Sequence, residues 1–327
     1  MNHLQTIDFV ASVGSEKKHS FQLTYQVYGL PLHHAPIILV NHSLTGNSQV
    51  TGSKGWWKSL IGVGGTIDLN CYTVIAFNIP GNDYLTTPIW SKNYKELSTK
   101  SVAQLFWQAL DALSIKKLFA VIGGSLGGAI AWEMSFLRPE SIKYLIPIAT
   151  HHSASDWVIA NVWVQDRILN HSIHPIEDAR SHAMLLYRTP ESLASKFKKT
   201  QENQRDFEVE NWLKYHGSLL HQRFSISAYR QMNYLLRTIG VDRTDNQVVD
   251  YAKNTTAKIH IIAINSDYMF PHSEQVKAYL ELKTHTPNVS IHSIDSIHGH
   301  DAFLIEYDQL NKILNPILEN ESIEIWR

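Results

Sequence analysis

The chain has 327 residues, of which 44% are hydrophobic and 18% are charged, and its formal net charge is −1. This length suits one sizeable domain, alone or with an insertion, and the near-zero charge argues against a dedicated binder of nucleic acid or anionic membranes. The single cysteine, Cys71, excludes an intrachain disulfide framework and fits a reducing compartment. Neither a signal-peptide pattern nor a membrane-spanning apolar run is visible, so we expect a soluble, cytoplasmic protein.

The first part of the chain predicts three strands, a helix and a fourth strand. Phe21–Tyr28 alternates apolar and polar residues with period two, which is typical of an antiparallel strand with one buried face. Ile37–Val40 and Tyr72–Phe77 are short apolar runs of the kind found in buried strands. Thr99–Ala112 carries apolar residues at a spacing of three to four, which indicates an amphipathic helix. Leu118–Ile122 is another buried strand.

A glycine-rich turn with a serine at its centre follows this fourth strand. The residues are Gly123-Gly-Ser-Leu-Gly-Gly128, and the chain then continues with helical composition. A strand, a tight G-x-S-x-G turn and a helix together form a nucleophile elbow, in which only small residues fit beside the serine. Ser125 is therefore the candidate nucleophile, and the backbone N–H of Leu126 is a candidate oxyanion donor. A phosphate-binding turn is disfavoured because no Gly-Lys-Ser or Gly-Lys-Thr follows.

A second oxyanion donor is expected in the loop after the early buried strand. In elbow enzymes this donor comes from the loop that follows such a strand. Here the strand Ile37–Val40 leads into Asn41-His-Ser-Leu-Thr-Gly46. We therefore nominate the backbone N–H of Leu44, with that of Thr45 as the alternative.

The middle of the chain changes character. After a strand over Leu145–Ala149, residues 151–254 show helical spacing, as in Trp157–Gln165 and Ala228–Leu236, and no strand run. We interpret 151–254 as a helical lid inserted into a catalytic domain made of residues 1–150 and 255–327. The alternative is a separate small helical domain without a catalytic role.

The last part of the chain supplies an acid and a base. A buried strand, Lys258–Ile264, is followed by Asp267, and after a helix over Ser273–Leu282 the last strand, Val289–Ile294, is followed by His300. A closing helix is predicted over residues 303–314, with Pro316 just beyond it.

The order Ser125, Asp267, His300 is that of the triad in an α/β-hydrolase fold, with each residue in a loop just beyond a strand. Alternating strands and helices predict a mostly parallel sheet with helices on both faces. His300 would remove the proton of Ser125, and Asp267 would orient the imidazole. His298 and Asp295 remain alternatives for the base and the acid.

The histidines do not predict a metal site. The chain has 18 of them, and several occur close together in the sequence. They lack carboxylate or cysteine partners at a recognisable ligand spacing, and no His-Glu-x-x-His occurs. We therefore expect neither a metal nor a bound cofactor.

Several motifs together resemble the homoserine O-acetyltransferase family of α/β-hydrolases. They occur in the family's order across most of the predicted catalytic domain. They are Asn41-His-Ser-Leu-Thr-Gly46, Gly55-Trp-Trp57 with Ile67-Asp68, Ala120-Val-Ile-Gly-Gly-Ser-Leu-Gly-Gly128, Ser266-Asp-Tyr-Met-Phe-Pro271 and Gly299-His-Asp-Ala-Phe-Leu304. In the lid, Ala179-Arg180 with Tyr187, and His221-Gln-Arg-Phe224 with Tyr229, are also similar to the family.

This resemblance implies an acyltransferase that uses acetyl-CoA as a co-substrate and L-homoserine as the acceptor, in methionine biosynthesis. By the same resemblance Arg180 would bind the homoserine carboxylate, Asp301 would bind its ammonium group, and Tyr187 would line the pocket. The resemblance also implies a homodimer through the lid helices. The aromatic residues Trp157, Trp163 and Trp212 would suit such an interface, and packing in the core would explain them equally.

The chain departs from the family's pattern in two segments, Gly81–Pro88 after the third strand and Val162-Trp163 in the first lid helix. These departures leave succinyl-CoA open as the donor and serine open as the acceptor. A hydrolase of small esters and a catalytically idle binding protein are the alternatives from other functional classes.

Overall fold

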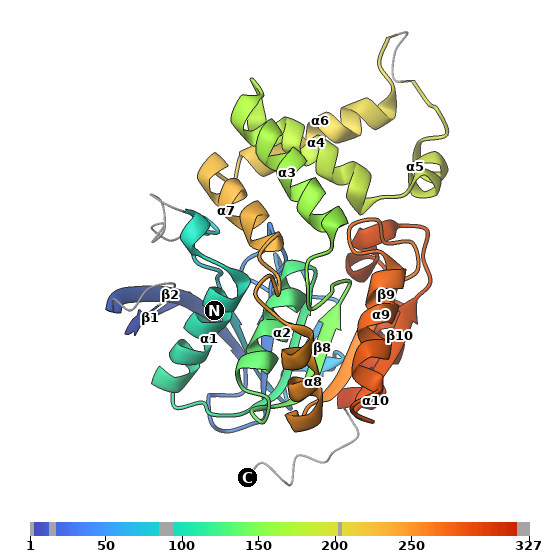
Figure 1. The fold of residues 1–327 in the computed structure, drawn as a ribbon. Coiled ribbons are helices and arrows are strands. Elements are labelled where there is room, and N and C mark those ends of the chain that lie inside the picture. The colour runs from blue at the N-terminus through green and yellow to red at the C-terminus, as the bar shows by residue number, and fades with distance from the viewer. Residues whose placement is uncertain (1–2, 13–17, 85–93, 202–204, 319–327) are drawn as a thin grey trace.

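One sheet organises the molecule. The computed structural model describes residues 3–12, 18–84, 94–201 and 205–318. Within these residues, eight strands form a sheet in the order β1-β2-β6-β3-β7-β8-β9-β10, in which β1, β2 and β6 pair antiparallel and the remaining neighbours pair parallel (Figure 1). The strands are β1 (Gln5–Ser12), β2 (Lys18–Gly29), β3 (Ile37–Asn41), β6 (Thr73–Phe77), β7 (Leu118–Gly124), β8 (Ile142–Ile148), β9 (Lys258–Ile264) and β10 (Val289–Ile294). The short strands β4 (Ile61–Gly62) and β5 (Ile67–Asp68) pair separately.

Both faces of the sheet are buried. Along β3, Leu39 belongs to one apolar core while its neighbours Ile38 and Val40 belong to the other, because successive side chains of a strand point to opposite faces. The helices that contribute to the first core include α1 (Thr99–Ala112), α2 (Leu126–Leu137), α8 (Asp245–Asn254) and α9 (His272–Lys283), and this core continues into the helices between β8 and β9. Helix α10 (Tyr307–Leu318) contributes to the second. The predicted α/β-hydrolase architecture, a mostly parallel sheet covered on both faces, is confirmed.

A helical insertion lies over one end of the sheet, between β8 and β9 (Figure 1). It consists of α3 (Asp156–His171), α4 (Pro175–Tyr187), α5 (Pro190–Phe197), α6 (Glu208–His221) and α7 (Ile226–Leu236). Helix α8 belongs to the predicted range 151–254, but it lies beside α2 and packs on α9 rather than on the insertion (Figure 1). Its buried face, which includes Val248 and Tyr251, joins the apolar core of the sheet.

The structure differs from the sequence-based expectation at two places. Strand β1 was not predicted, although it pairs with β2 from Gln5 to Ser12. The closing helix begins at Tyr307 rather than residue 303, and Pro316 lies inside it. Ile317 and Leu318 are buried beyond that proline, so their packing outweighs the cost of a missing backbone donor.

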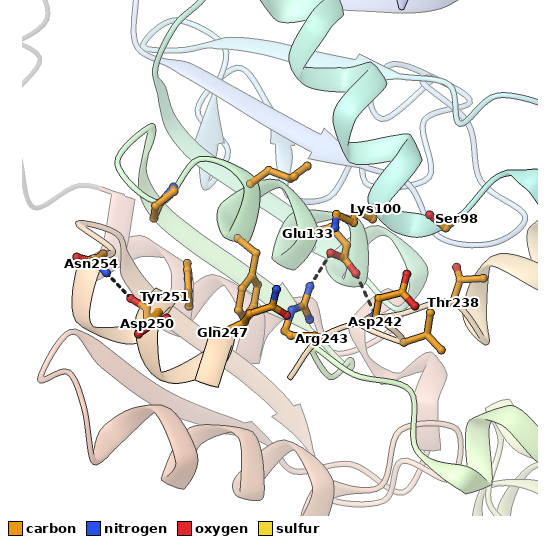
Figure 2. A pocket seen from close by; sticks show the side chains of 15 residues that line it. Ser98, Lys100, Glu133, Thr238, Asp242, Arg243, Gln247, Asp250, Tyr251 and Asn254 are labelled. Carbon is orange, nitrogen blue, oxygen red and sulfur yellow. Dashed lines mark hydrogen bonds and ion pairs between the residues drawn. The ribbon is translucent and has the colours of Figure 1, made fainter. Parts of the chain in front are cut away.

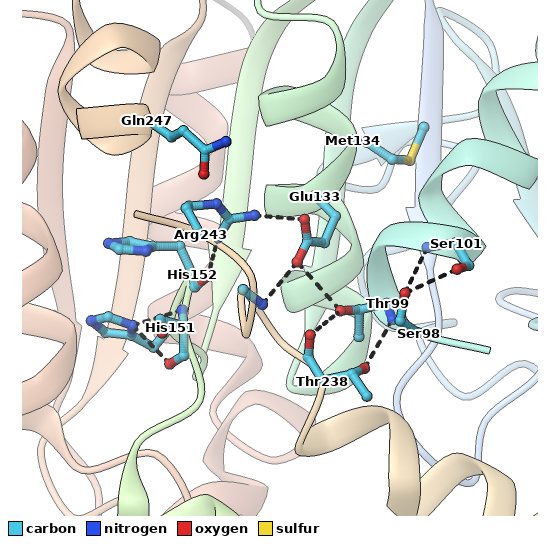
Figure 3. Close-up of polar contacts among 12 residues, drawn as sticks. Ser98, Thr99, Ser101, Glu133, Met134, His151, His152, Thr238, Arg243 and Gln247 are labelled. Carbon is cyan, nitrogen blue, oxygen red and sulfur yellow. Dashed lines mark hydrogen bonds and ion pairs between the residues drawn. The ribbon is translucent and has the colours of Figure 1, made fainter. Parts of the chain in front are cut away.

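The exit of the insertion is clamped to α2 by a buried carboxylate, that of Glu133. One of its oxygens accepts hydrogen bonds from the backbone N–H of Gly240 at 2.9 Å and the hydroxyl of Thr99 at 3.3 Å (Figure 3). The other pairs with the guanidinium of Arg243 at 2.5 Å, and Arg243 also donates to the carbonyl of His152 at the entry of the insertion. Both connections between the insertion and the sheet are therefore held by the Glu133–Arg243 pair, and its carboxylate belongs to the helix that begins at Leu126.

Candidate active site

The turn between β7 and α2 holds Ser125 in a conformation that is rare for residues with a side chain. Its φ is 57° and its ψ is −126°, and it is the N-cap residue of α2. Its backbone N–H donates to the carbonyl of Ile148 on β8 at 2.9 Å, and its carbonyl accepts from Ala129 at 3.0 Å. These bonds keep the strained backbone in place, as expected for a nucleophile elbow.

The glycines beside Ser125 are required by close backbone approaches. A β-carbon on Gly127 would collide with the carbonyls of Asn41, the last residue of β3, and His42, the first residue of the loop after it. A β-carbon on Gly123 would lie 2.5 Å from the backbone carbonyl carbon of Gly127 itself. The paired glycines therefore let α2 start directly against β7 and against the loop that was predicted to supply the second oxyanion donor.

The three predicted triad side chains are joined by hydrogen bonds. His300 Nε2 lies 2.9 Å from Ser125 Oγ, and His300 Nδ1 lies 2.8 Å from Asp267 Oδ2. The other oxygen of Asp267 accepts from the backbone N–H groups of Met269 at 2.7 Å and Phe270 at 2.9 Å. All three triad side chains are buried. Because the carboxylate holds Nδ1–H, Nε2 is left as the acceptor for the serine hydroxyl.

The surroundings of His300 favour its protonated form. Burial lowers the pKa of this imidazole, but the charge of Asp267, the hydrogen bond with Asp267 and the charge of Asp301 together raise it by more, so the net pKa lies above the ordinary value. Three aromatic rings surround the imidazole, with centroids 5.6 to 5.7 Å from its own: those of Tyr187, Phe270 and Phe303. These rings restrict its rotation and keep water away from it.

The alternative acid and base lie elsewhere. Asp295 is exposed, and its side chain accepts a hydrogen bond from Asn265 at 2.5 Å. His298 places Nδ1 2.9 Å from the hydroxyl of Ser192 on α5. The structure thus brings His300 and Asp267 to Ser125 and gives His298 and Asp295 other partners.

The loop after β3 is held by a histidine that the sequence interpretation did not single out. His42 Nδ1 lies 2.7 Å from the carbonyl of Ser43, and Nε2 accepts from the backbone N–H of Ile79 at 3.0 Å. Burial lowers the pKa of His42 to about 4, so it is neutral at pH 7. It ties the Leu44 loop to the loop after β6. The oxyanion roles of Leu44, or Thr45, and of Leu126 stay predictions.

The residues assigned by resemblance to the amino-acid substrate also gather near His300. The guanidinium carbon of Arg180 lies 5.4 Å from the centroid of the Tyr187 ring, which itself faces the imidazole. Asp301 follows His300 directly, and its Oδ2 accepts a hydrogen bond from Arg188 Nε at 3.1 Å. Arg188 was missed by the sequence interpretation, although it directly follows Tyr187.

The pocket beside the triad is distinct from a second cavity elsewhere in the molecule. A small pocket beside the triad loops is lined by Leu44, Val162, Tyr187 and Met269 among others. A cavity of about 340 Å³ lies instead along α2 and α8, where Lys100, Asp242 and the paired Glu133 and Arg243 line it (Figure 2). No triad residue lines this cavity.

The two departures from the family's pattern differ in how far the structure describes them. Val162 is buried, whereas Trp163 is 62% exposed. Of the segment Gly81–Pro88, residues 85–88 lie outside the described residues. In the described part of the chain, no helix is long and apolar enough to cross a bilayer, and no three His, Cys, Asp or Glu residues group as metal ligands.

Comparison with known proteins agrees with this geometry. A family model described as the alpha/beta hydrolase fold matches residues 36–306. A homoserine O-acetyltransferase from Methanococcus vannielii is 32% identical, over 92% of this chain and 69% of the relative. The chain belongs to the homoserine O-acetyltransferase-like alpha/beta hydrolases.

Solved structures with the same fold include both a homoserine O-acetyltransferase and an esterase. A homoserine O-acetyltransferase from Bacillus anthracis superposes with a TM-score of 0.85 at 16% identity, covering 99% of both chains. Esterase E22 superposes with a TM-score of 0.85 at 14% identity, covering 97% of this chain and 100% of its own. At these identities the likeness concerns the fold, so the activity has to be argued from the site.

Proposed function

We propose that this alpha/beta hydrolase is an acyl-CoA-dependent O-acyltransferase that moves an acetyl group from acetyl-CoA to the hydroxyl of L-homoserine. This reaction belongs to methionine biosynthesis. Ser125, His300 and Asp267 are the catalytic residues, and the N–H groups of Leu126 and Leu44 form the oxyanion hole. Arg180, Tyr187 and Asp301 bind the amino acid.

One observation carries the proposal: charged groups of both signs flank the hydrogen-bonded triad beneath the helical insertion. Tyr187 faces His300 with 5.6 Å between ring centroids, and Arg180 lies over the same tyrosine. Asp301 follows the catalytic histidine in sequence. A guanidinium and a carboxylate near one imidazole suit a zwitterion such as an amino acid, because each charge of the ligand meets its opposite. A neutral ester would need neither group.

The first half-reaction acylates the serine. Ser125 Oγ attacks the thioester carbonyl while His300 Nε2 accepts its proton, and Asp267 stabilises the imidazolium. The negative oxygen of the tetrahedral intermediate is bound by the two backbone N–H groups, each contributing ~3 kcal/mol. When the intermediate collapses, the C–S bond breaks and CoA leaves as the thiol with the proton from His300.

The second half-reaction transfers the acyl group, as in a ping-pong mechanism. His300 takes the proton of the homoserine hydroxyl, whose oxygen attacks the acyl-serine carbonyl. The ester bond to Ser125 breaks, the serine recovers a proton from His300, and O-acetylhomoserine is released. The helical insertion limits the access of water, which would otherwise hydrolyse the acyl-enzyme.

Location and assembly are part of the same proposal: a cytoplasmic homodimer formed through the insertion. Trp157 is 50% exposed and Trp163 is 62% exposed, both on α3. Exposed tryptophans of one helix suit the centre of a protein interface.

The test is a thiol-release assay with purified protein. Acetyl-CoA with L-homoserine should release free thiol faster than acetyl-CoA alone, and the product should be O-acetylhomoserine by mass spectrometry. Parallel reactions with succinyl-CoA and with L-serine identify the donor and the acceptor. Release that no amino acid stimulates, together with rapid turnover of p-nitrophenyl acetate, would contradict the transferase and favour a hydrolase.

Ser125→Ala is the matched variant for this assay. It should abolish thiol release and the covalent labelling by a fluorophosphonate, because Ser125 Oγ is the only atom removed. Circular dichroism should remain that of the parent protein. If Ser125→Ala releases thiol at a rate close to that of the parent, Ser125 is not the nucleophile.

A further inference from the structure

The carboxylate of Asp301 is held by a partner from the helical insertion. Asp301 lies in the short helix η2 (Gly299–Leu304), one position after the catalytic His300. Its Oδ2 accepts a hydrogen bond from Arg188 Nε at 3.1 Å, and both side chains are 19% exposed. Within the described residues, no hydrogen bond is made to its other oxygen, Oδ1. The pair is therefore largely shielded from water, and one carboxylate oxygen is left for a ligand.

Arg188 is itself fixed from two sides. It follows directly after α4, and its guanidinium carbon lies 5.9 Å from the centroid of the Trp212 ring on α6. The end of α4 also packs on the backbone of η2: a β-carbon on Gly299 would lie 2.9 Å from the carbonyl oxygen of Tyr187. Gly299 has a φ of +70°, so it meets this contact in a conformation that favours glycine. Tyr187 and Arg188 thus reach the catalytic loop together.

The position of Asp301 creates a conflict that Arg188 resolves. A carboxylate beside the general base stabilises the imidazolium, so a smaller fraction of His300 is neutral and able to accept a proton at neutral pH. The same carboxylate is needed if an ammonium group is to be bound near the reacting hydroxyl. A guanidinium bonded to Oδ2 balances the charge of Asp301 while the acceptor site is empty.

We propose that Arg188 is a positioning residue: it holds Asp301 by Oδ2, which directs Oδ1 to the ammonium group of the acceptor and shields His300 from the Asp301 charge. This inference rests on the proposed function for the ammonium group, whereas the shielding of His300 holds for any acyl acceptor. The other titratable or charged side chains around Asp301 and His300 are Asp267, Arg180, Tyr187 and His216, with Lys196 beyond His216.

The first measurement separates acceptor binding from the acyl-donor step. Arg188→Gln should raise the KM for homoserine by about tenfold or more, as for loss of a hydrogen bond to a charged group, and leave the KM for acetyl-CoA unchanged. Arg188→Lys keeps the charge without the planar Nε donor and should raise the homoserine KM less. The matched control is Arg167→Gln, which removes another guanidinium that lies over a tryptophan of the insertion, 5.8 Å from the Trp163 centroid.

The second measurement needs no acceptor. In the pH profile of p-nitrophenyl acetate hydrolysis, Arg188→Gln should move the acid limb to higher pH, because the unbalanced charge of Asp301 then raises the pKa of His300 further. In an Asp301→Asn background, Arg188→Gln should move the limb no further. A purely structural role for Arg188 would lower the rate at every pH alike.

The outcomes distinguish the two proposals. If homoserine does not stimulate thiol release by the parent protein, the proposed function is overturned. The pH profile then still decides whether Arg188 shields His300. An unchanged homoserine KM and an unchanged acid limb in folded Arg188→Gln overturn the inference. If Arg188→Gln does not fold, Arg188→Lys decides: a raised homoserine KM with the parent's acid limb supports the inference, and an unchanged KM overturns it.

Discussion

At the scale of single residues, backbone strain and buried charge set the chemistry of the site. Ser125 holds a φ of 57°, and Gly123 and Gly127 let the helix after it start without a collision. His300 is buried, which disfavours its cation, yet two carboxylates raise its pKa above the ordinary value. The site therefore stabilises the imidazolium that forms during the reaction. In return, His300 stays protonated, and unable to act as a base, up to a higher pH than an ordinary histidine.

The pH dependence of Asp301→Asn follows from this balance. Removing one of the two negative charges lowers the pKa of His300, so the neutral base persists to lower pH. The acid limb of kcat/KM for p-nitrophenyl acetate should move to lower pH in Asp301→Asn. Asp295→Asn is the control, because that exposed carboxylate bonds Asn265 instead. An acid limb that moves upward would show that Asp301 does not act on His300 through its charge.

At the scale of elements, α2 has two tasks, one at its N-terminus and one in its C-terminal half. Its N-terminus follows Ser125 and includes Leu126, whose N–H is the predicted oxyanion donor, and its C-terminal half carries the Glu133 clamp (Figure 3). Arg243 and Glu133 are 8% and 3% exposed, so their charges depend on each other rather than on water. The helix that presents the nucleophile is thus also the anchor for the insertion that covers it.

Breaking this clamp should cost much more stability than breaking a surface pair. Glu133→Gln leaves the buried Arg243 guanidinium without its counter-charge, so we expect a loss of about 3–5 kcal/mol in the free energy of unfolding. The control is Asp111→Asn, whose pair with Arg138 is 31% exposed on both sides and should cost less than about 1 kcal/mol. Urea denaturation of the two variants measures both values. Equal losses would mean that the clamp is not an anchor.

At the scale of the whole molecule, the insertion closes over the end of the sheet where the triad lies (Figure 1). Several polar contacts join it to the loops beneath, and among them Arg223 donates to the carbonyl of Thr45 at 2.8 Å and the N–H of Ser225 donates to Asp83 at 3.0 Å. The first of these contacts lies next to Leu44, beside the predicted oxyanion hole. Under the proposed mechanism, closure of the insertion would therefore control the access of water to the acyl-enzyme.

Loosening this closure should change the fate of the acyl-enzyme. Arg223→Ala removes a charged donor, a change of roughly 1.5–3 kcal/mol at most, and we expect acetyl-CoA hydrolysis to rise several-fold relative to transfer to homoserine. The ratio of free thiol to O-acetylhomoserine measures it, with Arg167→Ala as the control on the same insertion. An unchanged ratio would place the barrier to water elsewhere.

The sequence by itself determined the strands that carry the site and the order of Ser125, Asp267 and His300. These features are local: apolar runs define buried strands, and small residues beside a serine define the elbow. It did not predict β1, which depends on pairing with β2, or the end of the closing helix, which depends on burial beyond Pro316. Local patterns therefore located the catalytic groups but not every boundary of the fold.

Only the tertiary structure decided which partners these groups have. His300 rather than His298 reaches Ser125, across 175 positions of the chain. Arg188 meets Asp301 across 113 positions, and Arg243 meets Glu133 across 110. An arginine next to a helix has the same local sequence pattern whether it is solvated or paired, so no spacing in the sequence distinguishes these cases. Folding brings these distant charges together and buries them. Burial then determines how strongly Asp301 and Arg188 act on the pKa of His300, and how much the Glu133–Arg243 pair contributes to the stability of the insertion.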